Sequence, residues 1–318
     1  MLLAAASAVS LASGAVSVAP GEVAAVLAHR LGIGAEPSRQ VDAVVWGIRM
    51  PRVLLGITVG ACLAAVGGVM QGLFRNELAD PHLLGIGPGA AVAAAMGSQI
   101  GGVQTAIGLG LIGGVLTALV LRRLAGRTSI DPTRMILSGV ALGLALSAWV
   151  GFVVFAADRS RVPPIEFWLL GSLSAATWKG WWTLLLPAVV GCIVLIASWR
   201  ALDLMALGDP EARHLGVRTD LVRTSLLIVC GAVVGATVGV AGVVVFVGLL
   251  VPFVVRRLGG PSHRRLLAAS LAGGASFVVV ADLFARTVME PVEIPLGLVT
   301  AAVGGPLFLW LVSRRRDA

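Results

Sequence analysis

Charge is scarce in this chain of 318 residues, because Asp, Glu, Lys and Arg together make up 13% of it. A soluble domain carries about 25% charged residues, so the composition excludes an ordinary soluble enzyme. Hydrophobic residues reach 58% and the mean hydropathy is +0.97, which excludes a disordered chain. Since a spanning helix needs about 20 predominantly apolar residues, these values predict an all-α polytopic membrane protein.

Lysine and cysteine are also rare. Lys179 is the only lysine, and it does not lie in the G-x-x-x-x-G-K-[ST] run of a Walker A loop, so the chain cannot carry a P-loop ATPase. Cys62, Cys192 and Cys230 fall inside apolar stretches without disulfide or metal-ligand spacing. The formal charge of +8 is distributed in arginine clusters between apolar runs, which indicates membrane topology rather than nucleic-acid binding. We expect no metal site and no bound cofactor.

Apolar segments predict about ten transmembrane helices. Several are shorter than the usual span and Pro252 interrupts one of them, so we expect tilted or broken helices. The first segment also resembles a secretory signal peptide in its small residues, but it lacks a basic n-region. Keeping it as a helix makes the loop charges alternate. The ten segments are 1–19, 52–73, 85–101, 104–121, 134–157, 181–199, 222–241, 243–256, 266–285 and 296–313.

The basic residues favour an orientation with both termini in the cytoplasm. In that orientation most of the 24 Lys and Arg residues lie on the inner side, as the positive-inside rule requires. The outer exceptions are Arg30, Arg39, Arg49, Arg52, Arg159, Arg161, Lys179 and Arg286.

Three outer arginines lie where a membrane protein disfavours cations. Arg49 and Arg52 bracket Pro51 at the start of a span, where the helix dipole opposes positive charge. They indicate either an acidic partner outside the membrane or ordinary snorkelling of long side chains. Arg286 follows Asp282 at i,i+4 and is expected to neutralise that intramembrane carboxylate. An ion-coupled secondary transporter with Asp282 as its coupling group stays open as an alternative.

The longest inner connection, about 199–223, contains LGDPEARHLG. This run predicts a short helix with Asp209 as N-cap, Pro210 at the first position, Glu211 in the first turn and Gly216 as the stop. A structured inner loop is typical of a docking element, and a plain solvated connector is the alternative.

Long motifs then follow one another over nearly the whole chain, among them RMPRVLLGITVGACLAAVGGVMQGLFRNELADPHLLGIGPGA, LDLMALGDPEARHLGV, FVGLLVPFVVRRLGGPSHRRLL and EIPLGLVTAAVGGPLFLWLV. With them the sequence resembles the permease subunit of type II ABC importers, the family that carries iron chelates, haem and cobalamin. LFRNxLADP, FWxLGSLxxATW and the terminal FLWL are most similar to the haem branch. Cobalamin and ferric siderophores stay open as cargo.

The resemblance implies a single transmembrane permease domain over 1–318, with ten helices per protomer and a homodimer around a central pathway. It implies a bacterial inner-membrane location, a periplasmic substrate-binding protein and two cytoplasmic ATPase subunits that bind ATP and Mg. The chain itself is then a transport subunit and not an enzyme.

The same resemblance assigns roles by position. Binding-protein docking falls to Arg49, Arg52 and Arg286. Contact with the ATPase falls to Asp209, Glu211, Ala212, Leu215 and Gly216. The translocation pathway falls to Thr133, Ser138, Leu142 and Leu146.

Overall fold

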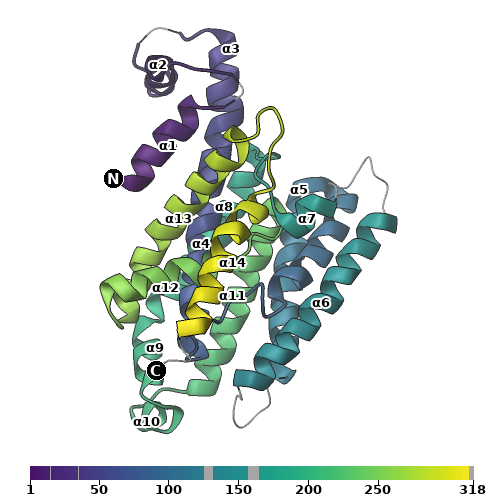
Figure 1. The fold of residues 1–318 in the computed structure, drawn as a ribbon, viewed down its shortest axis with the longest axis vertical. Helices are drawn as coiled ribbons and strands as arrows, with labels where there is room; N and C mark the ends of the chain where they lie inside the picture. The colour runs from purple at the N-terminus through teal and green to yellow at the C-terminus, as the bar shows by residue number, and fades with distance from the viewer. Residues whose placement is uncertain (15, 35, 125–131, 157–164, 315–318) are drawn as a thin grey trace.

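The chain forms a bundle of helices (Figure 1). The computed structural model describes residues 1–14, 16–34, 36–124, 132–156 and 165–314, and only the backbone at 132–136, 165–166, 308 and 311–314. The described elements are α1 (Leu2–Ala12), α2 (Pro20–Arg30), α3 (Arg39–Asp42), the π-helix η1 (Ala43–Arg49), α4 (Met50–Leu73), α5 (Ile86–Leu124), α6 (Pro132–Ala156), α7 (Ile165–Leu170), α8 (Trp178–Ala197), α9 (Trp199–Ala206), α10 (Asp209–His214), α11 (Thr219–Ala241), α12 (Val247–Gly259), α13 (His263–Thr287) and α14 (Leu296–Arg314).

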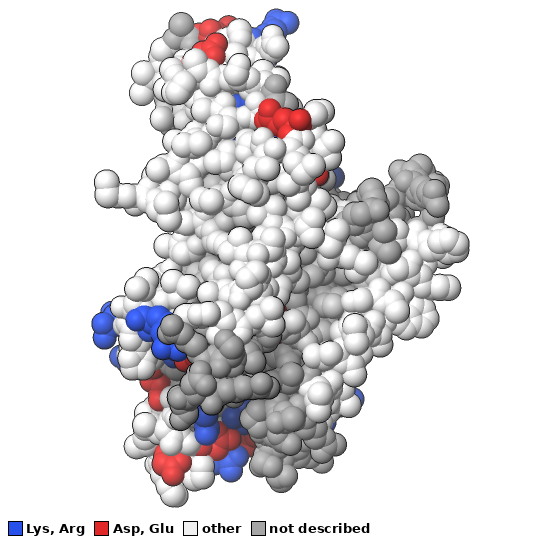
Figure 2. Space-filling view, viewed as in Figure 1, with Lys and Arg blue, Asp and Glu red and all other residues white. Residues whose placement is uncertain are grey.

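Six helical segments in the described ranges are long and apolar enough to cross a membrane, and they coincide with six predicted spans. They are Arg39–Leu73, Val103–Leu124, Leu137–Ala156, Trp178–Ala197, Thr219–Ala241 and His263–Thr287. In Figure 2 charged side chains gather at the two ends of the visible face and leave an uncharged band between them. This distribution is that of an integral membrane protein. The count of ten spans stays a prediction.

Two predicted spans, 85–101 and 104–121, form the two halves of α5. Gly101 and Gly102 leave helical geometry between them, and Gly102 has a φ of +71°. The halves run antiparallel, since Gly89 lies against Thr117 and Gly97 lies against Thr105. The reversal uses a left-handed backbone that glycine adopts without strain.

Glycine also brings whole helices together. A Cβ atom on Gly114 of α5 would lie 2.1 Å from the carbonyl oxygen of Gly231 on α11, and one on Gly235 would lie 2.1 Å from that of Gly110. Only glycine permits backbones this close, which is how helices associate in lipid. The small-residue pairs at these positions therefore serve packing within one protomer.

Helix α4 lies at the centre, packed against α8, α11, α12 and α13. Its Gly60 contacts the backbone of Gly274 on α13, and its Gly67 contacts Gly248 on α12. The helix at the predicted span 243–256 is displaced along the chain, because residues 242–246 are not helical and α12 runs from Val247 to Gly259.

The first predicted span, 1–19, needs correction. Helix α1 has 11 residues and ends at Ala12, where Ser13 turns to an extended conformation and Gly14 takes a φ of +139°. At about 1.5 Å per residue, α1 is too short to cross a bilayer. The following α2 and α3 lie at the end of the bundle opposite α10, as Figure 1 shows. We refer to these two ends as the α2 end and the α10 end.

Candidate functional site

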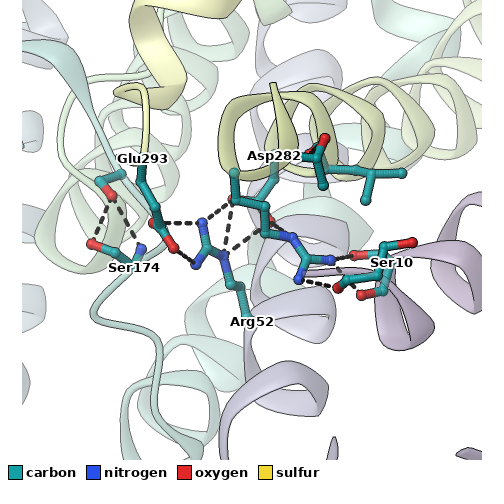
Figure 3. A network of polar contacts seen from close by, with 10 residues as sticks. Ser10, Arg52, Ser174, Asp282 and Glu293 are labelled. Atoms are coloured by element: carbon teal, nitrogen blue, oxygen red, sulfur yellow. Dashed lines mark hydrogen bonds and ion pairs between the residues drawn. The ribbon is translucent and has the colours of Figure 1, made fainter. Parts of the chain in front are cut away.

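Arg52 lies at the α2 end between two carboxylates, one on α13 and one in the loop before α14 (Figure 3). Its Nη2 lies 2.9 Å from Asp282 Oδ1, and its Nη1 lies 2.9 Å from Glu293 Oε1. The side chains of Arg52 and Asp282 are only 10% and 4% exposed. A bidentate guanidinium is the group best suited to such a buried pair.

Arg49 and Arg286 bind the C-terminal end of α1. Arg49 Nη1 donates to the carbonyl oxygens of Leu11 and Ala12 at 2.7 and 2.8 Å. Arg286 Nη1 donates to the carbonyl oxygen of Ser13 at 2.9 Å, and its Nη2 donates to Ser10. These carbonyls have no partner within α1 and carry the negative end of its dipole, so cations are favourable there.

We call Arg49, Arg52 and Arg286 the α2-end arginine cluster. The sequence places Arg49 at the unfavourable end of α4, but the fold brings it to the favourable end of α1. All three residues are buried, with exposed fractions of 4%, 8% and 7%. In this structure they bind groups of their own chain, so snorkelling to the membrane surface does not describe them. Docking to a binding protein stays a prediction.

A cavity of about 190 Å³ adjoins the α2-end arginine cluster. All three arginines line it, together with Glu290 and Glu293. The cavity therefore combines buried cations with carboxylates that already compensate part of their charge.

Asp282 was predicted to be neutralised by Arg286, and the structure confirms the contact. Arg286 Nε lies 3.7 Å from Asp282 Oδ2, in addition to the pair with Arg52. Both of its guanidinium partners belong to the same chain, so the carboxylate is occupied by structural contacts. This arrangement does not favour a group that gains and loses a coupling ion, as the secondary-transporter alternative requires.

At the α10 end, the predicted short helix is present as α10. Its N-cap is Gly208 rather than Asp209, because the Asp209 carboxylate binds arginines instead of the first helical N–H groups. Arg75 donates to Asp209 Oδ1, and Arg223 Nη2 lies 3.2 Å from Asp209 Oδ2. Gly216 ends the segment with a φ of +88°, as predicted.

The docking candidates on α10 differ in exposure. Glu211 and Gly216 are exposed, Asp209 is partly buried, and Leu215 is 58% exposed. Ala212 is fully buried in the core, so its side chain is unavailable to a partner here. Leu207, just before α10, is also 64% exposed. Two exposed leucines beside a charged helix form a surface typical of protein docking.

The pathway candidates belong to α6. Ser138, Leu142 and Leu146 are half-buried, and their spacing of four places them on one helix face. The side chain of Thr133 lies outside the described part of the chain. Next to this face, Gly139 contacts Leu84 of the α4–α5 loop.

Sequence reasoning missed the contacts of Arg75 with Asp209 and of Arg52 with Glu293. No local signal could have found them, since the partners are 134 and 241 residues apart. Among the described residues, no group of three His, Cys, Asp or Glu side chains could hold a metal ion.

The same fold occurs in ABC transporters. A solved metal-chelate type ABC transporter in an inward-facing conformation aligns with a TM-score of 0.82 at 29% identity, covering 98% of this chain and 96% of that chain. PsaBC from Streptococcus pneumoniae aligns with a TM-score of 0.55 at 18% identity, covering 81% of this chain and 88% of that chain. At this identity the likeness shows a similar fold and nothing more. The apolar band and this fold define an integral membrane permease of the ABC transporter class.

Sequence comparison identifies the family. The FecCD transport family matches residues 2–314. The hemin transport system permease protein HmuU of Yersinia pestis is 38% identical over 285 residues, which cover 86% of this chain and 84% of HmuU. The vitamin B12 import system permease protein BtuC of Klebsiella pneumoniae is 38% identical over 276 residues, which cover 86% of this chain and 83% of BtuC. The chain belongs to the FecCD family of type II ABC importer permeases, which are transport components and not enzymes.

Proposed function

We propose that this protein is the permease subunit of an ATP-driven importer that moves haem or another iron chelate from the periplasm to the cytoplasm. The observation that carries the proposal is the family match over residues 2–314. Haem is proposed as the cargo because of the similarity to HmuU. Cobalamin is the second candidate, because the sequence identity to BtuC is the same, 38%. A ferric siderophore is the third.

The proposed assembly is a homodimer of this chain in the bacterial cytoplasmic membrane, with the α10 end in the cytoplasm. Two ATPase subunits, which bind ATP and Mg, contact the α10 end. The exposed Glu211, Leu215 and Gly216 support this placement. No cofactor is assigned to the permease chain itself.

A periplasmic binding protein contacts the α2 end in this proposal. The cavity lined by the α2-end arginine cluster offers buried cations to an acidic side chain. Because these arginines already bind carboxylates and carbonyl oxygens, an acidic partner has to replace an existing contact.

The transport mechanism is alternating access. ATP binding brings the partner subunits together, and α10 passes this movement to the pathway. The cargo alone makes no evident distinction between the two states, so the population shift has to come from ATP.

The function is tested by reconstituting the permease with its ATPase and binding protein in proteoliposomes. ATP-dependent uptake is compared for haem, a ferric siderophore and cobalamin. We expect uptake of haem. Uptake of cobalamin alone would exclude the haem assignment, and ion-driven uptake without ATPase would exclude the importer class.

A further inference from the structure

Helix α4 ends with an unusual residue at the α10 end. Arg75 follows the C-cap Phe74 in a left-handed conformation with a φ of +46°. The backbone N–H of Asn76 donates to the carbonyl oxygen of Gln71 at 3.1 Å, and that of Arg75 donates to Gly72 at 3.3 Å. This is a Schellman ending, and its left-handed position favours glycine because a side chain there strains the backbone. An arginine at this position therefore requires an explanation.

The contacts of the Arg75 side chain explain why an arginine occurs at this position. Its guanidinium donates to the Asp209 carboxylate of α10, while Arg223 of α11 binds the same carboxylate from its own helix at 3.2 Å. This ion pair links the end of α4 to α10. A glycine would relieve the backbone strain and abolish the link.

The loop after Arg75 is well ordered by its own hydrogen bonds. The Asn76 side chain accepts from the Leu78 N–H at 3.0 Å, and the Asp80 carboxylate accepts from the His82 N–H at 2.8 Å. Asp80 is only 1% exposed. Turns of this kind restrict the conformation of the loop backbone.

The far end of this loop lies on α6. A Cβ atom on Gly139 would lie 2.8 Å from the Leu84 Cα, and one on Gly85 would lie 3.0 Å from the Gly143 backbone nitrogen. A side chain at either glycine would therefore collide with the neighbouring backbone, so the loop and α6 are closely packed. This packing joins the loop to the helix that carries Ser138 and Leu142.

We propose that Arg75 is a positioning residue that transmits the movement of α10, through loop 76–85, to α6. The arginine at this strained position pairs with Asp209 of α10, a contact that a glycine could not make. The inference rests on the proposed function, in which α10 receives its movement from the ATPase.

The test measures cargo imported per ATP hydrolysed in proteoliposomes that contain permease, ATPase and binding protein, using whichever of haem, ferric siderophore and cobalamin the parent takes up. We expect Arg75→Gly and Arg75→Ala to lower this ratio by about tenfold or more, a size typical of coupling between sites. Arg75→Lys keeps the charge and restores most of the ratio. Arg123→Ala, at an exposed arginine of α5, serves as the matched control and stays at the parent value.

A second readout separates transmission from folding. Ser138→Cys on α6 is labelled with a membrane-impermeant maleimide, with and without ATP and vanadate. Arg75→Gly should keep the parent melting temperature, ATPase binding and ATP hydrolysis, but should lose the nucleotide-dependent change in labelling. If Arg75→Gly retains both the parent ratio and this change, the inference is overturned while the proposed function stands. If the parent complex shows no ATP-dependent uptake, both are overturned.

Discussion

The two ends of the molecule use arginine in different ways. At the α2 end, each guanidinium of the arginine cluster is buried and bound by carboxylates or by carbonyl oxygens of α1. At the α10 end, the Arg75 and Arg213 side chains are 44% and 55% exposed and pair with carboxylates that are also partly exposed. A buried ion pair loses much when one partner is removed, whereas an exposed pair contributes little to stability. The comparison indicates that the buried arginines of the first end stabilise the fold more than the exposed pairs of the second end do.

The largest expected effect follows removal of the central arginine of the α2 end. Arg52→Ala leaves Asp282 buried with a weaker partner and should lower the free energy of unfolding by about 3–5 kcal/mol. Unfolding by denaturant in mixed micelles measures this change. Arg39→Ala, at an exposed arginine of the same end, is the control and should stay near the parent. An Arg52→Ala protein as stable as the parent would show that the buried arginine does not stabilise the α2 end.

Asp282→Asn should have a smaller effect, because it removes the charge and keeps the shape. Arg52 retains Glu293, and Arg286 retains the carbonyl oxygens of α1. The expected loss is about 1–3 kcal/mol, the range for an impaired buried polar contact. Uptake per folded protein should be preserved. Complete loss of uptake in a protein of parent stability would instead support Asp282 as a coupling group.

At the α10 end, Arg223→Ala should destabilise the protein by about 1 kcal/mol, as for one hydrogen bond at a partly exposed site. Arg223 itself is only 8% exposed, but its partner Asp209 is 33% exposed and keeps Arg75. The free energy of unfolding of Arg223→Ala is compared with that of Arg213→Ala, because both side chains of the Arg213–Asp220 pair are exposed. A loss equal to that of Arg52→Ala would show that burial does not separate the two ends.

The smallest effect is expected for Arg30→Ala, which removes a surface pair with Asp42 at 2.6 Å. Such pairs contribute about 0–1 kcal/mol, and at 1 M salt the Debye length falls to about 3 Å. The difference from the parent should therefore shrink in high salt, whereas that of Arg52→Ala should persist. Melting curves at low and high salt provide the measurement.

Much of the architecture could be predicted from the sequence because apolar runs and turn signals are local. The six long spans and the helix α10 were predicted in this way. The break of segment 1–19 after Ala12 could not be predicted, because it depends on how Arg49 and Arg286 bind the end of α1.

The sites were harder to predict, because burial is a property of the tertiary structure. Arg52 was recognised as a misplaced charge, but its partner Asp282 is 230 residues away. Ala212 was grouped with its neighbours as a docking residue, although one turn of α10 directs it into the core.

We propose that the ATPase binds the α10 end, whereas the buried arginines of the α2 end stabilise the fold. Leu215→Asp tests it most directly, because Leu215 is 58% exposed and a charge there should not affect folding. In nanodiscs, the variant should bind the ATPase subunit at least about tenfold more weakly, equivalent to about 1.4 kcal/mol, at an unchanged melting temperature. Unchanged affinity for the ATPase would show that the α10 end is not its binding surface.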